Sequence, residues 1–423
     1  MRKNILTTFL LFVFLVVMMQ NVNAAVNISA TNAIVVDAET NEIIYAKDID
    51  SKIYPASITK LLTATILTQH KQKDDLLTYT QDASEEEPYT IIANVIPTLQ
   101  VGDKFTADEV MKMLLIFSGN DMAVMIAENV AASIDDFMKE INDYAQSIGM
   151  KNSHFVTPNG LQNDDHYTTA YDLSLLMREV IKNPWIMEVL AMPTADIEFN
   201  GETYTIETRN HLLGIDGCVG GKTGQTDEAG KCLASYFEVG SRKLISVVLN
   251  DTLDNVDDET SAVFVDTLSV VQYALEQKKE PYIVKDSQVQ EGTITYKPLK
   301  YFGPERTVNV GAILKDDFSI YKNDVNTAAV STQYDINFNS LDAWNLNKDT
   351  PIGKLMITQR EGTQTMNLYP SIDTQEIIDS NKKLYILVFS IAGLIVLIIL
   401  ILIILIIVKV SHGKKKAKNR RYR

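Results

Sequence analysis

Residues 54–64 read Tyr-Pro-Ala-Ser-Ile-Thr-Lys-Leu-Leu-Thr-Ala and enter a helical run in the first third of the chain. At the start of a helix, Ser57 and Lys60 lie one turn apart on the same face. A serine hydroxyl is a poor nucleophile unless a base takes its proton, and lysine serves only when burial, a second cation or a helix N-terminus lowers its pKa. Ser57 and Lys60 are therefore a candidate nucleophile and base, although the same spacing recurs by accident at Ser411 and Lys414.

A second polar motif, Ser118-Gly119-Asn120, lies between two predicted helices. The first helix begins at a capping box formed by Thr106 and Glu109 and ends at Phe117. A loop of this kind can aim a hydroxyl and a carboxamide into a cleft, where the hydroxyl relays a proton and the amide orients a peptide. Taken alone, the motif is better explained as the polar residues that end one helix and begin the next.

The third motif is Lys222-Thr223-Gly224, on a predicted strand that ends at a turn over residues 226–229. On an edge strand, the ammonium supplies positive charge, the hydroxyl can bind a carboxylate, and Gly224 lets a substrate approach the backbone. The order Ser-x-x-Lys, Ser-x-Asn, Lys-Thr-Gly is the signature of penicillin-binding proteins and class A β-lactamases. The combination gives each short motif a specificity that it lacks alone.

The pattern around the motifs predicts an α/β domain over residues 25–280. Strands are expected at Ala33–Asp37 and Ile43–Tyr45, and again at Gly230–Phe237 and Lys243–Leu249. Three- and four-residue apolar spacing predicts helices between them, at Lys60–Gln69, Asp108–Phe117, Met122–Ala132, Ile134–Ile148 and Ala170–Ile181, and a last helix at Ser261–Gln277. Strands at both ends of a helical block indicate one sheet closed by the two ends of the domain.

Residues 281–370 have a different pattern, with short alternating runs between turn residues and no helical segment. This composition predicts a small all-β module, a sandwich. A polar stretch over residues 371–383 is expected to link the module to the apolar segment that begins at Leu384.

The two ends of the chain predict export and a membrane anchor. Residues 1–24 have a basic start, an apolar centre and a small-residue cleavage pattern, which together are typical of a signal peptide. Residues 384–408 are almost wholly apolar and long enough to span a bilayer. Residues 409–423 carry eight basic and no acidic side chains, so the positive-inside rule places this tail in the cytoplasm and the body outside the cell. We expect a single-pass protein of the cell membrane.

Charge and composition exclude several classes of protein. The chain has 54 acidic and 39 basic residues; twelve of the basic ones lie outside residues 25–381, so the exported body carries a net charge of −27. Such acidity argues against a nucleic-acid binder. The five histidines are scattered and no glycine-rich phosphate loop is present, so neither a metal nor another cofactor is expected. Cys218 and Cys232 are left open, as a disulfide or as two buried thiols.

The chain resembles the low-molecular-weight penicillin-binding proteins that are serine-type D-alanyl-D-alanine carboxypeptidases. Beyond the three motifs, the similar stretches are residues 33–45, 55–62, 114–127, 155–161, 166–173 and 222–233, and the likeness extends over roughly residues 28–375. The resemblance implies the antiparallel sheet and helical block of the penicillin-binding-protein and β-lactamase fold, followed by the β module and a C-terminal membrane attachment.

The resemblance also implies a catalytic set. Ser57 would attack the carbonyl between two D-alanines, with Lys60 as general base, and Ser118 would pass the proton to the leaving D-alanine. The substrate would be a peptidoglycan stem peptide that ends in D-Ala-D-Ala, and β-lactam antibiotics would acylate Ser57 as covalent inhibitors. The cytoplasmic membrane is the other expected partner.

Substrate binding is implied for a second group of residues. Asn120 would hold the peptide, and Lys222 would complete the electrostatic set. Thr223 and Arg209 would bind the terminal carboxylate. The backbone N–H groups of Ser57 and Gln225 would form the oxyanion hole.

Two other functions are left open. A class A β-lactamase would need a second carboxylate base for deacylation, but residues 155–173 hold Asp164, Asp165 and Asp172 and no glutamate. A non-catalytic wall-binding scaffold on the same fold would be expected to lack one of the catalytic residues.

Overall fold

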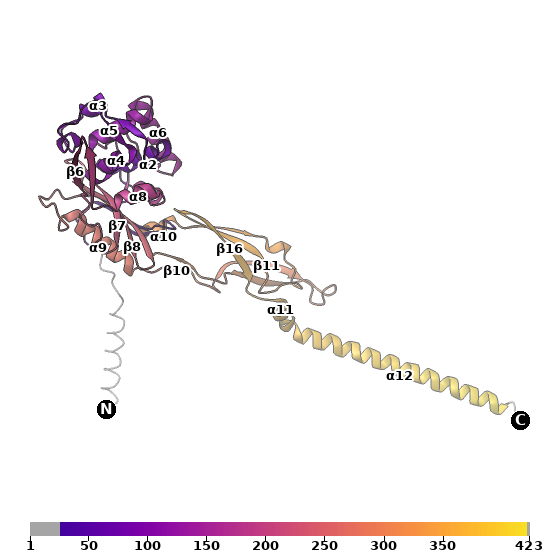
Figure 1. Ribbon diagram of the computed structural model, residues 1–423. Helices are drawn as coiled ribbons and strands as arrows, with labels where there is room; N and C mark the ends of the chain where they lie inside the picture. The colour runs from indigo at the N-terminus through magenta and orange to yellow at the C-terminus, as the bar shows by residue number, and fades with distance from the viewer. Residues whose placement is uncertain (1–25, 421–423) are drawn as a thin grey trace, which may run out of the picture. The chain divides into compact units, whose positions relative to one another are not determined.

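A computed structural model describes residues 26–420 (Figure 1). The predicted signal peptide lies outside the described residues. The chain divides into two compact units: the first extends to Lys278 and also takes in Tyr321–Thr327, and the second comprises Lys279–Ile320 and the chain from Ala328 onward.

One antiparallel sheet organises the first unit. Its strand order is β2 (Ile43–Lys47), β1 (Asn32–Asp37), β9 (Arg242–Asp251), β8 (Gly230–Val239), β7 (Cys218–Thr226). Strand β1 pairs with β9 from Asn32 opposite Leu249 to Asp37 opposite Leu244. The expectation of a sheet closed by the two ends of the domain is confirmed, and β7 forms one edge of that sheet.

Helices cover both faces of this sheet, as Figure 1 shows. Along β1, Ile34 and Val36 belong to a large apolar cluster with the helical block, whereas Ala33 and Val35 belong to a smaller cluster with α9 (Ala262–Glu276). This alternation is the period of two that places successive strand residues on opposite faces. The helical block comprises α2 (Lys60–His70), α4 (Ala107–Lys112), a π-helix (Met113–Phe117), α5 (Asn120–Val130), α6 (Ile134–Ser147), α7 (Ala170–Val180) and α8 (Pro184–Leu190).

Several short elements of the first unit were not anticipated. The hairpin of β5 (Thr194–Phe199) and β6 (Glu202–Glu207) turns at Asn200 and Gly201, both with positive φ. An Asn-Gly pair between alternating strands is a strong hairpin signal, so the sequence did carry this information. The others are the hairpin of β3 (Leu76–Thr78) and β4 (Lys104–Thr106), the one-turn helix α3 (Gln81–Ser84), a 3₁₀ turn at Ile92–Asn94 and helix α8.

The second unit is built on antiparallel strands, as expected. Five strands follow the order β11 (Gln288–Tyr296), β12 (Arg306–Ile313), β16 (Gly362–Pro370), β15 (Gly353–Gln359), β14 (Ser331–Ile336), and β10 (Glu280–Ile283) pairs separately with β13 (Phe318–Ile320). Strands β12 and β16 meet at two residue pairs, and apolar clusters form around Leu355 and around Ile294.

The expectation that residues 281–370 hold no helical segment is wrong. Helix α10 spans Asp324–Ala329, and a 3₁₀ turn spans Phe338–Ser340. The start of α10 is held by Asn323, whose Oδ1 accepts a hydrogen bond from Asn326 N at 2.8 Å. A six-residue helix is too short to show a helical period, so this local cap was the signal available.

The stretch at residues 371–383 is folded. Helix α11 (Thr374–Ser380) begins at Asp373, whose side chain accepts a hydrogen bond from Glu376 N, and buries Ile377 in the cluster around Ile294. Helix α12 (Lys382–Arg420) comes directly after it, and its residues 382–412 are apolar and long enough to cross a membrane.

Candidate active site

The turn that presents Ser57 has an unusual backbone. Residues Ala56–Thr59 form a 3₁₀ turn that leads into α2 at Lys60, and Ala56 has a φ of 46°. This left-handed conformation is strained for a residue with a side chain and persists only where its surroundings enforce it. Gly160 packs against the turn so closely that a Cβ at this position would lie 1.9 Å from Ala56 O.

Lys60 lies beneath Ser57 and is completely buried. Its Nζ lies 2.8 Å from Ser57 Oγ, 2.7 Å from Asn120 Oδ1 and 2.8 Å from the carbonyl oxygen of Asn159. Burial and then the charge of Lys222 hold the pKa of Lys60 well below its usual range. The side chain therefore meets the condition for a lysine base: it loses its proton far more readily than a lysine in water.

The three partners of Lys60 fit a neutral amine. A neutral amine has two N–H donors and one lone pair. The carbonyl oxygens of Asn120 and Asn159 are acceptors only, so they take the two N–H groups. The lone pair then faces the Ser57 hydroxyl, which can donate its proton.

Ser118 and Asn120 enter the site from the junction of two helices. The π-helix ends at Phe117, the next residue Ser118 has a left-handed φ of 76°, and α5 begins at Asn120. Ser118 Oγ lies 3.0 Å from Nζ of Lys222, while Asn120 joins Lys60 to the carbonyl of Tyr89, which accepts from Asn120 Nδ2 at 2.7 Å. The Ser-Gly-Asn segment thus contacts both Lys60 and Lys222. A segment that only separated two helices would not need these contacts.

Edge strand β7 closes the opposite side of the site. Lys222 is buried, and burial together with the charge of Arg209 lowers its pKa to about 7. Two residues on, and so on the same face, a Cβ at Gly224 would lie 2.9 Å from Pro55 O and 3.1 Å from Ser57 N. Gly224 therefore lets β7 approach the Ser57 turn, a packing role in addition to the substrate contact expected from the sequence.

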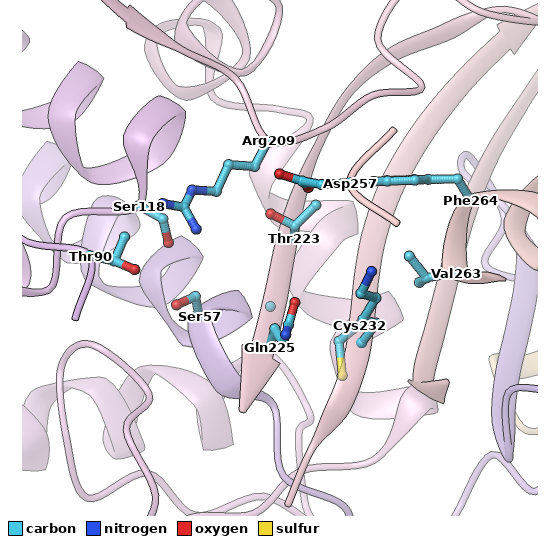
Figure 2. A pocket seen from close by; sticks show the side chains of 12 residues that line it. Ser57, Thr90, Ser118, Arg209, Thr223, Gln225, Cys232, Asp257, Val263 and Phe264 are labelled. Carbon is cyan, nitrogen blue, oxygen red and sulfur yellow. The ribbon is translucent and has the colours of Figure 1, made fainter. Parts of the chain in front are cut away.

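A cavity opens between these elements. Figure 2 shows Ser57 and Ser118 facing the same space, with Thr223 and Gln225 projecting from β7 on the other side. Arg209 also lines it, and its guanidinium lies 5.4 Å from the ring centre of Phe117. The structure thus brings all the predicted site residues together: Lys60, Asn120 and Lys222 are buried behind the cavity wall, and the others line it.

Four further residues shape the site and were not predicted. Asn159 supplies the carbonyl that contacts Lys60, and its Nδ2 donates to Glu86 Oε2 at 2.9 Å. Burial raises the pKa of Glu86, and its charge opposes the lowering of the Lys60 pKa. Thr90 and Asp257 line the cavity. The Pro-Asn-Gly turn that holds Asn159 is a signal that sequence analysis could have used. Nothing in the sequence links Glu86 to Lys60.

The two thiols are free and buried. Cys232 lies opposite Gly224 in the β7–β8 ladder, and Cys218 lies opposite Phe237, so the two are separated along the strands. Burial raises the pKa of Cys218 to about 11 and that of Cys232 to about 12. Burial and a raised pKa both lower the reactivity of a thiol.

Comparison with known proteins gives consistent similarities. The family model described as D-alanyl-D-alanine carboxypeptidase matches residues 18–252, more than half of the chain. D-alanyl-D-alanine carboxypeptidase DacF of Bacillus subtilis is 29% identical over 224 residues, which are 52% of this chain and 57% of that protein. DacA of Escherichia coli is 28% identical over 277 residues, 62% of this chain and 67% of its own. The chain thus spans little more than half the length of the first of these relatives.

Solved structures show the same fold. Penicillin-binding protein 5 of Haemophilus influenzae has a TM-score of 0.55 at 23% identity and covers 82% of this chain and 98% of its own. Penicillin-binding protein D2 of Listeria monocytogenes, in an ampicillin-bound form, has a TM-score of 0.51 at 27% identity and covers 59% of this chain and 98% of its own.

Proposed function

This chain belongs to the D-alanyl-D-alanine carboxypeptidase family, and on that premise we propose that it removes the terminal D-alanine from peptidoglycan stem peptides through an acyl-enzyme on Ser57. One observation carries the proposal: a buried lysine whose pKa is lowered lies 2.8 Å from the serine hydroxyl, with its other contacts made by acceptors alone.

Acylation begins with neutral Lys60. Its lone pair takes the proton of Ser57 as Oγ attacks the carbonyl between the two D-alanines. The oxyanion that forms is held by the backbone N–H groups of Ser57 and Gln225, donors of a kind that contribute about 2.7–4 kcal/mol each. The proximity of β7 to the Ser57 turn, enforced at Gly224, supports this pairing of donors from two elements.

The leaving D-alanine needs a proton on its nitrogen. Ser118 Oγ contacts Lys222 and faces the same cavity as Ser57, so it is placed to relay to that nitrogen the proton that Lys60 took from Ser57, which returns Lys60 to its neutral form. Expulsion of D-alanine leaves an ester on Ser57. Water then attacks this ester, which regenerates the hydroxyl and releases the shortened peptide.

The substrate binds along β7. An edge strand presents N–H and C=O groups to an extended peptide, which adds as a further strand. Thr223 and Arg209 bind the terminal carboxylate from the cavity wall. Lys222 adds positive charge from behind that wall. To hold the peptide, buried Asn120 exchanges its contact with the Tyr89 carbonyl for one with the substrate. β-Lactams use the same site, and the relative from Listeria monocytogenes solved in an ampicillin-bound form supports this part of the proposal.

We place the enzyme on the outer face of the cell membrane. In this proposal residues 1–24 are a signal peptide, residues 25–280 the catalytic domain and residues 281–370 the β module. Residues 371–383 connect the module to a membrane-spanning segment at 384–408, and the basic residues 409–423 lie in the cytoplasm. The length and hydropathy of helix α12 support the anchor.

The test uses the purified full chain in detergent, a peptide that ends in D-Ala-D-Ala, and a labelled penicillin. We expect release of D-alanine and a long-lived penicillin adduct, both lost in Ser57→Ala. Rapid hydrolysis of penicillin without D-alanine release would instead identify a β-lactamase, and the absence of both reactions would identify a non-catalytic scaffold.

A further inference from the structure

We propose that the hairpin tip between β11 and β12, residues 297–305, inserts into the lipid head-group region beside helix α12 and gives the second unit a second contact with the membrane. The proposal rests on the membrane attachment of α12 proposed above.

The base of this hairpin is clamped to the residue that precedes α12. Asn381 is buried, and its Nδ2 donates to the hydroxyl of Tyr296, the last residue of β11, at 2.7 Å. Its Oδ1 accepts from Arg306, the first residue of β12, also at 2.7 Å. Both strands of the hairpin are thus tied to one point of the chain, directly before the helix.

A third contact indicates which way the hairpin runs relative to α12. Beyond Tyr296, the buried Pro298 accepts a hydrogen bond at its carbonyl from the hydroxyl of Tyr385, at 2.7 Å. The contact nearer the hairpin tip is thus made by Tyr385, four residues after Asn381. Four residues correspond to about 6 Å along a helix that rises ~1.5 Å per residue. The tip runs alongside α12 in the direction of its apolar core, which begins at Leu384.

The tip has the side chains of a membrane interface. Tyr301 and Phe302 are each 72% exposed, although both are large aromatic residues. Lys297 and Lys300 flank them, with one acidic residue, Glu305, on the far side. Aromatic residues gather at the head-group level of membranes, where their apolar rings and polar edges are both solvated, and lysines there meet lipid phosphates. Two adjacent exposed aromatic rings form a contiguous apolar patch, which marks an interaction surface, whereas a singly exposed ring does not.

The proposed contact would restrict the orientation of the β module relative to the membrane. A single membrane-spanning helix leaves the domain above it free to tilt. A clamped hairpin whose tip also contacts lipid restricts that tilt, because the helix and the tip provide two contacts with the bilayer held by one set of hydrogen bonds.

The experiment places a fluorescent probe on the tip of the full chain in vesicles. Phe302→Cys is labelled with a thiol-reactive nitrobenzoxadiazole in vesicles of phosphatidylglycerol and phosphatidylcholine that carry bromine on their acyl chains. The native thiols are buried with raised pKa values, both of which disfavour their labelling, and the unsubstituted chain gives the background signal. Tyr282→Cys, 43% exposed on β10 of the same unit, is the matched control, and Leu397→Cys in α12 reports the anchor.

We expect blue-shifted emission and several-fold stronger bromine quenching at residue 302 than at residue 282. Quenching at residue 397 but no difference between residues 302 and 282 would overturn the lipid contact and leave the anchor intact. A polar environment at all three positions would overturn the anchor as well. Phe302 is exposed, so its replacement removes no core contact. Penicillin acylation at the unmodified rate confirms that the first unit of the labelled chain is folded.

Discussion

Gly224→Ala is the substitution that most sharply tests the packing of β7 against the Ser57 turn. The new Cβ would lie 2.9 Å from Pro55 O and 3.1 Å from both Ala56 Cβ and Ser57 N. Ordinary van der Waals contact begins at about 3.4 Å, and two of these three neighbours are backbone atoms that no rotamer change can move. Either β7 or the turn must therefore shift by about 0.5 Å.

This shift would move the proposed substrate-binding groups of β7 away from Ser57. Residue 224 lies between Thr223 and Gln225, so its displacement moves one proposed oxyanion donor and one proposed carboxylate ligand relative to Ser57. A misplacement of 1 Å costs about 10²-fold in rate, so 0.5 Å costs on the order of 10-fold. Overpacking also destabilises, typically by ~1–3 kcal/mol.

The assay is the second-order rate of Ser57 acylation by a labelled penicillin, measured beside a thermal melt. Gly220→Ala is the matched control: it lies on the same strand, and its added Cβ meets Leu190 at 3.1 Å, away from Ser57. We expect a fall of about 10-fold for Gly224→Ala alone. An unchanged acylation rate in a folded Gly224→Ala variant would refute the argument that this contact sets the donor geometry.

Three further predictions concern titratable groups. Lys60→Met should fold, yet acylate ~10²–10⁴-fold more slowly, because the proposed base is gone; stopped-flow acylation measures this. Glu86→Gln keeps an acceptor for Asn159 but removes a charge that raises the pKa of Lys60, so the acid limb of the acylation rate profile should move to lower pH. Burial and the neighbouring Asp266 raise the pKa of Asp251 to about 6, and the two carboxyls share the hydroxyl of Ser29. The folded chain holds that proton more tightly than the unfolded chain, so stability is lost as the pH rises from about 4 through about 6, and Asp251→Asn should flatten the dependence of Tm on pH in this range.

Each of these predictions has a distinct contrary result. Normal acylation by Lys60→Met would remove Lys60 from the base role. If Glu86→Gln and the control Glu85→Gln have the same pH profile of the acylation rate, the charge of Glu86 does not affect the pKa of Lys60. Parallel curves of Tm against pH for the parent and Asp251→Asn would show that the carboxyl pair titrates alike in the folded and unfolded chains.

Long periodic elements were predictable from sequence, and short ones were not. The apolar spacing of residues 134–148 predicted α6 to within a residue, because an amphipathic helix must repeat its apolar face. Helix α10 spans six residues and depends on a hydrogen bond to Asn323, which no periodicity reveals. The π-helix before Ser118 likewise resembled a continuation of α4, since both bury the same apolar run.

The site shows the same division. Ser57 and Lys60 are three residues apart, so local geometry alone predicted their contact. That Lys222 lies in the same site as Ser57 and Lys60 was predicted from the order of three motifs that a protein family shares. The spacing of these residues in the sequence did not predict it. Asn159 contacts Lys60, 99 residues away, and Glu86, 73 residues away, and this kind of proximity exists only in the folded chain.

The measurement that tests the account most directly is the position of the acyl group. Two serines, Ser57 and Ser118, face the same cavity, and only Ser57 contacts the buried Lys60. The full chain is acylated with penicillin, quenched with acid, digested and mapped by mass spectrometry. We predict the adduct on Ser57, at one equivalent per chain, and its absence from Lys60→Met at short times. An adduct on Ser118, or rapid labelling of Ser57 without Lys60, would contradict the account.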